Sequence, residues 1–188
     1  MTTPAQEQDV VDVLTEDHED VTQLLIDIQS SVDTKERRDL ADIVITELVR
    51  HSVAEEMFVY PVMREHLPNG EEAVEHDIEE HKVIERLLKD LEGLDADTAE
   101  FSDHIAELAQ TLADHVRDEE SEQFPQLRAL VPHDRLVEIA GAVATAKMIA
   151  PTRPHPMAPN NQAFHLLVGP GVGLVDRIRD KLSGKASA

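Results

Sequence analysis

Residues 51–61 read HSVAEEMFVYP, and residues 115–125 read HVRDEESEQFP. The two segments lie 64 positions apart and share a histidine, a pair of glutamates and a final aromatic–proline pair. Two further segments, HEDVTQLL from His18 and HKVIERLL from His81, repeat at an offset of 63. The chain thus contains the same order of motifs twice, first a single histidine and then a His-x-x-x-Glu-Glu segment. This order predicts a duplicated pair of helices.

Apolar residues recur at helical spacing through almost the whole chain, and no sustained alternation of period two is present. We therefore expect an all-α protein. Thr34 and Thr98 are expected N-caps, and Pro61 falls inside or near the end of the second helix. The four long helices are expected at about residues 9–31, 34–67, 71–92 and 98–131. Because short connections favour antiparallel neighbours, the expected architecture is an up-down-up-down four-helix bundle.

The bundle is expected to occupy residues 1–131 and to be followed by two further segments. A fifth, short helix is expected from Asp134 to about Ala150, within an additional segment of residues 132–150. Residues 151–188 form a Pro-rich C-terminal extension that begins with PTRPHPMAPNN, a composition typical of an extended strap. The extension ends with the amphipathic stretch GLVDRIRDKLSG, where we expect a short terminal helix.

The composition excludes several classes of function. The 188 residues contain no cysteine, so a disulfide framework, a thiolate metal site and a thiol nucleophile are excluded. The formal charge of −22 argues against nucleic acid as a partner. The start MTTPAQEQ lacks a secretory signal, and no apolar run approaches the roughly 18 residues that would span a membrane. We expect a cytoplasmic protein without a membrane partner, and a homodimer is left open.

The inward-facing stripe of each long helix carries metal-binding residue types where leucine is usual. In the second helix, the residues spaced alternately by three and four include His51 and Glu55 on consecutive turns. The same spacing selects one histidine in the first helix, one in the third, and a His–Glu pair in the fourth. The six candidate metal ligands are His18, His51, Glu55, His81, His115 and Glu119.

Each of these residues alone has an ordinary explanation. A lone histidine on an apolar face is usually a hydrogen-bonded core residue, and a lone glutamate can reflect a helix phase that is wrong by one residue. The combination favours metal, because buried carboxylates need compensating charge and the stripes contain no lysine or arginine. Duplicated His–Glu pairs fit two metals, with terminal histidines and bridging glutamates. Imidazole and carboxylate ligands suit iron or manganese.

These motifs resemble those of the hemerythrin-like, HHE cation-binding family. The resemblance covers about residues 10–131 and rests on His18, His51-x-x-x-Glu55, His81 and His115-x-x-x-Glu119, within EDH, HSVAEE, EEH and HVRDEE. It implies a non-haem centre of two iron ions joined by bridging carboxylates and an oxo or hydroxo bridge. It also implies a small-molecule ligand, namely hydrogen peroxide, nitric oxide or dioxygen.

The chain departs from the oxygen-carrying members of that family. They have two histidines four apart on the third helix, whereas the residue four before His81 is Asp77. Their last carboxylate follows the histidine by five residues, whereas the stripe selects Glu119 at four and Glu120 lies at five. An iron is therefore expected to have an extra open or water-filled position, or to bind Asp77.

We accordingly expect reaction with hydrogen peroxide or nitric oxide, as a catalase-like or nitric-oxide-handling activity, rather than reversible oxygen carriage. The alternatives are an oxygen- or redox-sensing binding module without turnover, and storage of iron or other cations.

Tyr60 is the only tyrosine, and the repeat pairs it with Phe124. Packing before a proline explains both rings but not the hydroxyl. On an ideal helix Tyr60 and Glu55 differ in direction by about 140 degrees, so binding of Tyr60 to iron requires a distortion, which Pro61 is expected to supply. Beyond the metal centre, Tyr60 is the one candidate catalytic residue, as a ligand or a hydrogen-bond partner. The other histidines are expected at the surface or at helix ends: His66, His76, His104, His133, His155 and His165.

Overall fold

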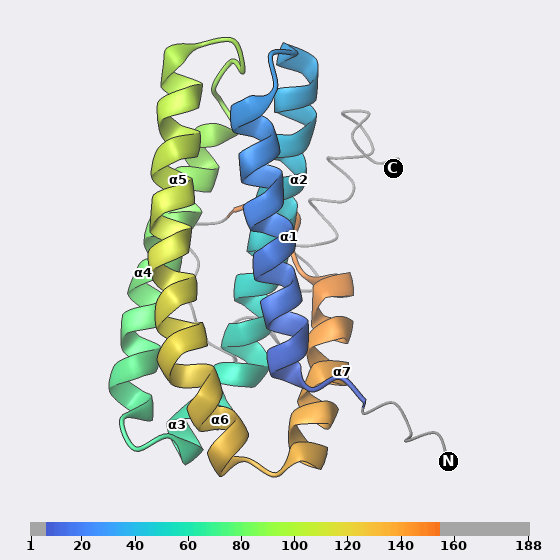
Figure 1. Ribbon diagram of the computed structural model, residues 1–188, viewed down its shortest axis with the longest axis vertical. Coiled ribbons are helices and arrows are strands. Elements are labelled where there is room, and N and C mark those ends of the chain that lie inside the picture. Colours follow the sequence, from blue (N-terminus) through green and yellow to red (C-terminus); the bar gives the residue numbers. More distant parts are fainter. Residues whose placement is uncertain (1–6, 155–188) are drawn as a thin grey trace.

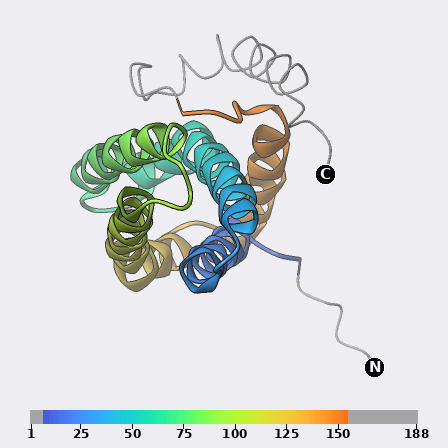
Figure 2. The ribbon, with the colours of Figure 1, turned by 90° about the horizontal axis from the view of Figure 1, so that it is seen from above.

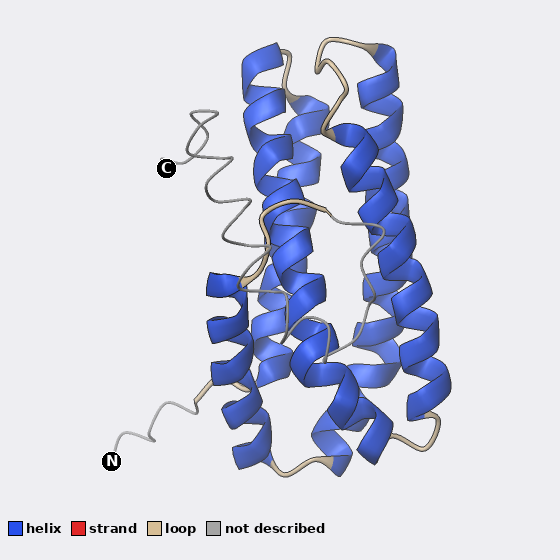
Figure 3. Ribbon diagram, turned by 180° about the vertical axis from the view of Figure 1, so that it is seen from behind, coloured by secondary structure: helices blue, strands red, loops and turns tan. Residues whose placement is uncertain are grey.

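The computed structural model describes residues 7–154, and over this range the chain forms helices joined by short loops, with no strand (Figures 1 and 3). The expected all-α class is therefore confirmed. The elements are α1 (Val10–Ser30), α2 (Thr34–Ala54), η1 (Glu55–Val59), α3 (Tyr60–His66), α4 (Gly70–Leu91), α5 (Ala99–Asp118), η2 (Glu119–Gln123), α6 (Phe124–Leu130) and α7 (His133–Ile149).

The bundle consists of four long helical segments, called rods here, of which α1 and α4 are single helices. α2 continues through the π-helical turn η1 into α3, and α5 continues through the π-helical turn η2 into α6. Seen from above, α1, α2, α4 and α5 surround one core, and α7 lies outside this ring against α1 and α2 (Figure 2). The expected four-helix bundle with a fifth, shorter helix is confirmed.

Side-chain caps fix the starts of three helices. Asp9 and Asp12 form a capping box at the start of α1, in which each carboxylate accepts a hydrogen bond from the backbone N–H of the other residue at 3.0 Å. Thr98 caps α5, as expected. The expected cap at Thr34 is wrong by one residue. The carboxylate of Asp33 accepts hydrogen bonds from backbone N–H groups at the start of α2, and Thr34 is already helical.

Two apolar clusters fill the bundle. One joins the start of α1 to η1, α3, α6 and α7, and the other joins the end of α1 to α2, α4 and α5. On α1 the first cluster ends at Leu14 and the second begins at Val21, with the buried His18 between them. The other three rods likewise carry a buried histidine where one cluster gives way to the other. A polar layer therefore crosses the bundle between the two apolar clusters.

The turn between α3 and α4 depends on glycine. A β-carbon added at Gly70 would lie 2.1 Å from the carbonyl oxygen of Met63, far inside van der Waals contact. The first turn of α4 therefore packs directly on the backbone of α3. Any larger residue at position 70 has to push the two helices apart.

Helix α7 is part of the core rather than a loose appendage. Its buried side chains Leu136, Ile139, Val143 and Ala146 belong to the same cluster as Leu14 at the start of α1. This packing holds one face of α7 against the first two helices of the bundle.

Within residues 7–154, no helix combines the length and the apolar character needed to cross a membrane. Residues 151–154 follow α7 without forming a helix. The rest of the expected Pro-rich extension, residues 155–188 with its expected terminal helix, lies outside the described residues.

Candidate metal centre

Six polar side chains from all four rods lie in the layer between the apolar clusters. Each is at most 4% exposed. They are His18 of α1, His51 of α2, Glu55 of η1, His81 of α4, His115 of α5 and Glu119 of η2. The structure thus brings together all six residues that the inward-facing stripes select.

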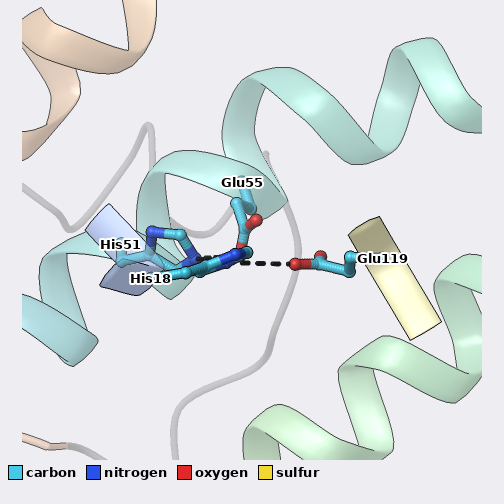
Figure 4. A group of neighbouring side chains, drawn as sticks. All are labelled: His18, His51, Glu55 and Glu119. Atoms are coloured by element: carbon cyan, nitrogen blue, oxygen red, sulfur yellow. Dashed lines mark hydrogen bonds and ion pairs between the residues drawn. The ribbon is translucent and has the colours of Figure 1, made fainter. Parts of the chain in front are cut away.

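His18, His51, Glu55 and Glu119 form a first group whose side chains converge (Figure 4). Nε2 of His18 lies 3.1 Å from Nε2 of His51 and 3.3 Å from Oε2 of Glu119. Nε2 of His51 lies 3.2 Å from Oε2 of Glu55. One ligand atom from each residue lies within 4.8 Å of the other three. A metal with bonds of about 2.0–2.2 Å to nitrogen and oxygen fits such a group.

A second group satisfies the same distance criterion, with one ligand atom from each residue within 4.8 Å of the others, and consists of Glu55, His81 and His115. Nε2 of His81 lies 3.3 Å from Oε2 of Glu55, and Nε2 of His115 lies 3.6 Å from Oε2 of Glu119. Each glutamate therefore contacts one histidine from each repeat of the chain. A carboxylate in that position is placed to join two metals.

Each of the four histidines turns its other ring nitrogen, Nδ1, toward a carboxylate. The distances from Nδ1 to the carboxylate oxygen are 2.8 Å for His18 and Glu120, 3.1 Å for His51 and Asp17, 3.1 Å for His81 and Glu56, and 2.9 Å for His115 and Glu80. A carboxylate at Nδ1 favours the tautomer with its proton on that nitrogen, which leaves the lone pair on Nε2. All four imidazoles are therefore oriented to bind a metal through Nε2.

The inward-facing stripes do not select these four outer carboxylates, because their positions on the helices face a neighbouring rod rather than the bundle axis. The internal repeat contains a signal for them. Asp17 and Glu80 each immediately precede a motif histidine, and Glu56 and Glu120 each immediately follow a motif glutamate. Glu120 follows His115 by five residues, but it contacts Nδ1 of His18 instead, from outside the cluster.

The donor set fits a cation. Both carboxylate oxygens of Glu55 and both of Glu119 are buried and lack a hydrogen-bond partner, as does Nε2 of His115. Their neighbours are the Nε2 atoms described above, at ion-pair distances. Because a buried carboxylate needs compensating charge, a protonated histidine or a metal ion has to supply it.

The electrostatics of the cluster favour positive charge strongly. Burial by itself would lower the pKa of His51, but the nearby carboxylates of Glu55 and Asp17 outweigh burial and raise this pKa to about 10. Burial would likewise raise the pKa of Glu55, whereas His51 and His81 hold it well below its ordinary value. A metal ion supplies the same positive charge and displaces the histidine protons.

The two π-helical turns place the glutamates and the aromatic rings. The backbone N–H of Tyr60 bonds to the carbonyl of Glu55, and that of Phe124 bonds to the carbonyl of Glu119, five residues back in both cases. Each ring therefore lies about one turn beyond its glutamate, on the same face. The expected distortion near Pro61 is present, and it takes the form of a π-helical turn that also precedes Pro125.

Tyr60 lies inside the centre. Its side chain is 1% exposed, its ring stacks on His81 with centroids 5.5 Å apart, and its hydroxyl oxygen lies 3.1 Å from Nε2 of His81. Phe124 stacks on His18 in the other half, with centroids 5.9 Å apart. The hydroxyl is thus the chemical difference between two similar ring stacks.

Asp77 is fully buried on α4, beside the second group. One carboxylate oxygen accepts a hydrogen bond from Nε2 of Gln123 at 2.9 Å, and the other has no hydrogen-bond partner. An oxygen of Asp77 also lies within 4.8 Å of ligand atoms of His115 and Glu80. Burial raises the pKa of Asp77 to about 6, against the opposing hydrogen bond from Gln123. Gln123 was not selected from the sequence, since a lone glutamine gives no metal signal.

The remaining described histidines stay outside the centre. His76 is largely exposed and lies 3.4 Å from Glu80 and 3.8 Å from Asp118. His66 and His133 sit at helix ends. His104 is partly exposed on α5, and His155 and His165 lie outside the described residues.

A four-helix bundle whose rods each contribute a buried histidine, with two glutamates between them, defines a cation-binding helical protein of the hemerythrin type. Residues 9–127 match the family model described as the hemerythrin HHE cation binding domain. The chain belongs to this family.

Two relatives and one solved structure are similar to the chain. The chain is 28% identical over 174 residues to an uncharacterized hemerythrin-like protein of Schizosaccharomyces pombe, covering 92% of this chain and 86% of that protein. It is 29% identical over 142 residues to a protein of Nostoc named DNA nickase, covering 76% of this chain but 40% of the Nostoc protein. A hemerythrin HHE cation binding domain-containing protein from Mycobacterium kansasii has a similar fold, with a TM-score of 0.65, 21% identity, and coverage of 75% and 86%.

Proposed function

We propose that the chain binds two iron ions in the buried layer and reacts there with a small oxidant. The proposed ligands are His18, His51, Glu55, His81, His115 and Glu119. The observation that carries the proposal is the position of the two glutamates, because an oxygen of each lies 3.2–3.6 Å from histidines of both repeats. In this arrangement both glutamates would be shared between the two irons, and the histidines would be terminal ligands.

The choice of iron rests on the donor set and the family. Nitrogen and oxygen ligands without thiolate suit iron, and paired carboxylates in a four-helix bundle are a known setting for two irons. Bound iron supplies an exchangeable coordination position and a reversible change of oxidation state. The protein supplies the oriented Nε2 atoms, the two carboxylates between the repeats and a buried layer bounded at both ends by apolar clusters.

The polar residues around the second group support a reactive site in that half. Tyr60, Asp77 and Gln123 are all buried and place a hydroxyl, a carboxylate and an amide beside His81 and His115. The corresponding residues of the other half, aligned by the internal repeat, are apolar: Leu14, Val59 and Phe124. At these three positions, hydrogen peroxide, nitric oxide or dioxygen would find polar groups in the second half and apolar side chains in the first. We propose that Tyr60 and Asp77 act there as ligands or as hydrogen-bond partners of the bound molecule.

Metal analysis with an optical spectrum tests the centre. We expect about two irons per chain, and loss of iron in His51→Ala and in His115→Ala while the helical circular dichroism is retained. His104→Ala is the matched control, because it removes a histidine of α5 outside the cluster and should keep its iron. A normally folded chain that takes up no iron, or variants that keep both irons, would overturn the proposal.

Turnover tests the reaction. Steady evolution of oxygen from hydrogen peroxide by the iron-loaded protein, or consumption of nitric oxide, supports an enzyme. Tight binding of dioxygen or nitric oxide without turnover supports the sensing module instead. Uptake of many irons per chain supports storage, which a closed pair of sites disfavours.

A further inference from the structure

Helix α7 reaches the proposed metal centre through one lysine. Nζ of Lys147 lies 2.5 Å from Oδ1 of Asp17, and Oδ2 of the same carboxylate lies 3.1 Å from Nδ1 of His51. The side chains of Lys147 and Asp17 are only 20% and 18% exposed. A continuous chain of polar contacts thus runs from α7 to a proposed ligand. Helix α7 lies beyond residues 9–127, the part of the chain that the family model matches.

The other half of the centre has a different outer contact. The internal repeat places Glu80 where Asp17 stands, and Glu80 accepts from Nδ1 of His115 at 2.9 Å, as Asp17 does from His51. Within residues 7–154, the ion-pair partners of Glu80 are His115 and the largely exposed His76, with no lysine or arginine. Lys147 therefore contacts the carboxylate of only one of two otherwise similar pairs, that of His51 and Asp17.

The geometry points to Lys147 as a positioning residue that makes the two metal positions unequal. This inference rests on the proposed di-iron centre. A carboxylate at Nδ1 makes an imidazole a stronger electron donor through Nε2. An ammonium on that carboxylate takes up part of its negative charge and fixes its orientation, so His51 donates less than His115. The pair is largely buried, and salt screens it little.

The expected consequence is a difference in reduction potential. The iron beside His51 has the weaker donor and the nearer cation, and both effects favour its ferrous state. The iron beside His115 would have Glu80 behind its histidine, a carboxylate that no lysine or arginine of residues 7–154 contacts. In the iron-loaded protein we therefore expect two separate one-electron steps, with the iron beside His51 reduced first.

A redox titration of the iron-loaded full chain tests this directly. Lys147→Met should move the higher-potential step to lower potential and leave the other step in place. Lys147→Arg keeps the charge and should restore the wild-type pattern. Lys82→Met is the control, since Lys82 is a lysine of α4 that pairs with the exposed Glu79. In an Asp17→Asn background, Lys147→Met should cause a smaller shift than in wild type, because the part of its effect that passes through Asp17 is already lost and only the direct effect of the cation remains.

A second measurement needs no metal. In the metal-free protein, NMR should detect the Nδ1–H of His51 held by Asp17, and Lys147→Met should move this proton signal downfield, because the carboxylate regains its full charge and the hydrogen bond strengthens. The corresponding signal of His115 should not change. If wild-type protein binds no iron, the proposed centre fails while this measurement still decides the role of Lys147. An unchanged His51 signal, or equal shifts of both redox steps, would overturn the inference.

Discussion

The hydroxyl oxygen of Tyr60 lies 3.1 Å from Nε2 of His81, the same ring atom that Oε2 of Glu55 approaches to 3.3 Å. The phenol oxygen therefore lies next to the contact between His81, a proposed terminal ligand, and Glu55, a proposed bridging ligand. The π-helical turn η1 makes this possible, because an ideal helix would direct Tyr60 away from Glu55. Tyr60 is placed to bind the iron beside His81 or to hydrogen-bond to a molecule there.

Replacement of Tyr60 by phenylalanine removes this one oxygen and keeps the ring stacked on His81. If the phenolate binds iron, the loaded wild-type protein has a visible charge-transfer band, and we expect Tyr60→Phe to lose it while keeping both irons. Visible absorption with iron analysis measures this. Phe124→Leu is the control, because it alters the equivalent ring without removing an oxygen and should keep the band. A spectrum unchanged by Tyr60→Phe would contradict a ligand role and leave hydrogen bonding.

The sequence predicts much of the bundle and of the polar layer because both follow from helical periodicity. His51 and Glu55 fall on one face whatever the details of packing, and the internal repeat doubles that information. Contacts between rods are harder to predict. That His81 faces Glu56 depends on the relative rotation of α4 and η1, which no local pattern sets.

The contact between Lys147 and Asp17 was beyond sequence reasoning for a similar reason. It depends on where α7 docks, and α7 docks through scattered apolar residues such as Leu136 and Val143, which fit several faces of a bundle. The π-helical turns were only partly foreseen. Proline explains a local break in the hydrogen-bond ladder, but it does not determine that the extra residue is inserted at Glu55.

Removal of the outer carboxylate from His115 should weaken metal binding. Glu80→Gln leaves an oxygen that can accept a hydrogen bond but removes the negative charge that makes His115 a strong donor. Loss of such support typically lowers metal affinity by about 10- to 100-fold. Titration against a competing chelator should show a loss in this range for one of the two metals.

Glu79→Gln provides the matched control for Glu80→Gln. Glu79 is the preceding residue, is exposed, and pairs with Lys82 on the surface of α4. It should leave both metal affinities within experimental error of wild type. Equal losses in the two variants would show that overall charge, rather than the contact with His115, controls the affinity.

Gly70→Ala should destabilise the fold without touching the metal layer. Its β-carbon would overlap the carbonyl oxygen of Met63 at 2.1 Å, so α3 and α4 have to separate. Overpacking of this kind costs about 1–3 kcal/mol, and each kcal/mol lowers the melting temperature of a chain of this size by about 2–4 °C. Thermal unfolding followed by circular dichroism should show the loss.

Gly141→Ala is the control for Gly70→Ala. Gly141 is exposed within α7, and nothing lies within 4 Å of an added β-carbon. Because alanine favours a helix over glycine by about 1 kcal/mol, this variant should unfold at the same or a higher temperature. A lower melting temperature for Gly141→Ala than for Gly70→Ala would contradict the steric explanation.

The ion pair between Asp9 and Arg128 should make stability depend on pH at the acid end. The guanidinium donates two hydrogen bonds to the Asp9 carboxylate, both at 2.9 Å, and so joins the start of α1 to α6. Burial alone would raise the pKa of Asp9, but Arg128 and the backbone N–H groups of Asp12 and Val11 together outweigh burial and lower it below 3.8. A lowered pKa in the folded state means that the stabilisation is complete at neutral pH. It is lost as the pH falls from 3.8 through the folded-state value.

Asp9→Asn isolates this charge, since asparagine caps a helix as well as aspartate does. We expect the variant to be less stable than wild type by about 1 kcal/mol or less at pH 7, because Arg128 is 45% exposed and solvent screens the pair. The difference should shrink below pH 3.8 in urea unfolding followed by circular dichroism. Asp33→Asn, at the exposed cap of α2, is the control and should show a smaller difference at pH 7. A gap between Asp9→Asn and wild type that widens in acid would contradict the assignment, because protonated Asp9 no longer carries the charge that pairs with Arg128.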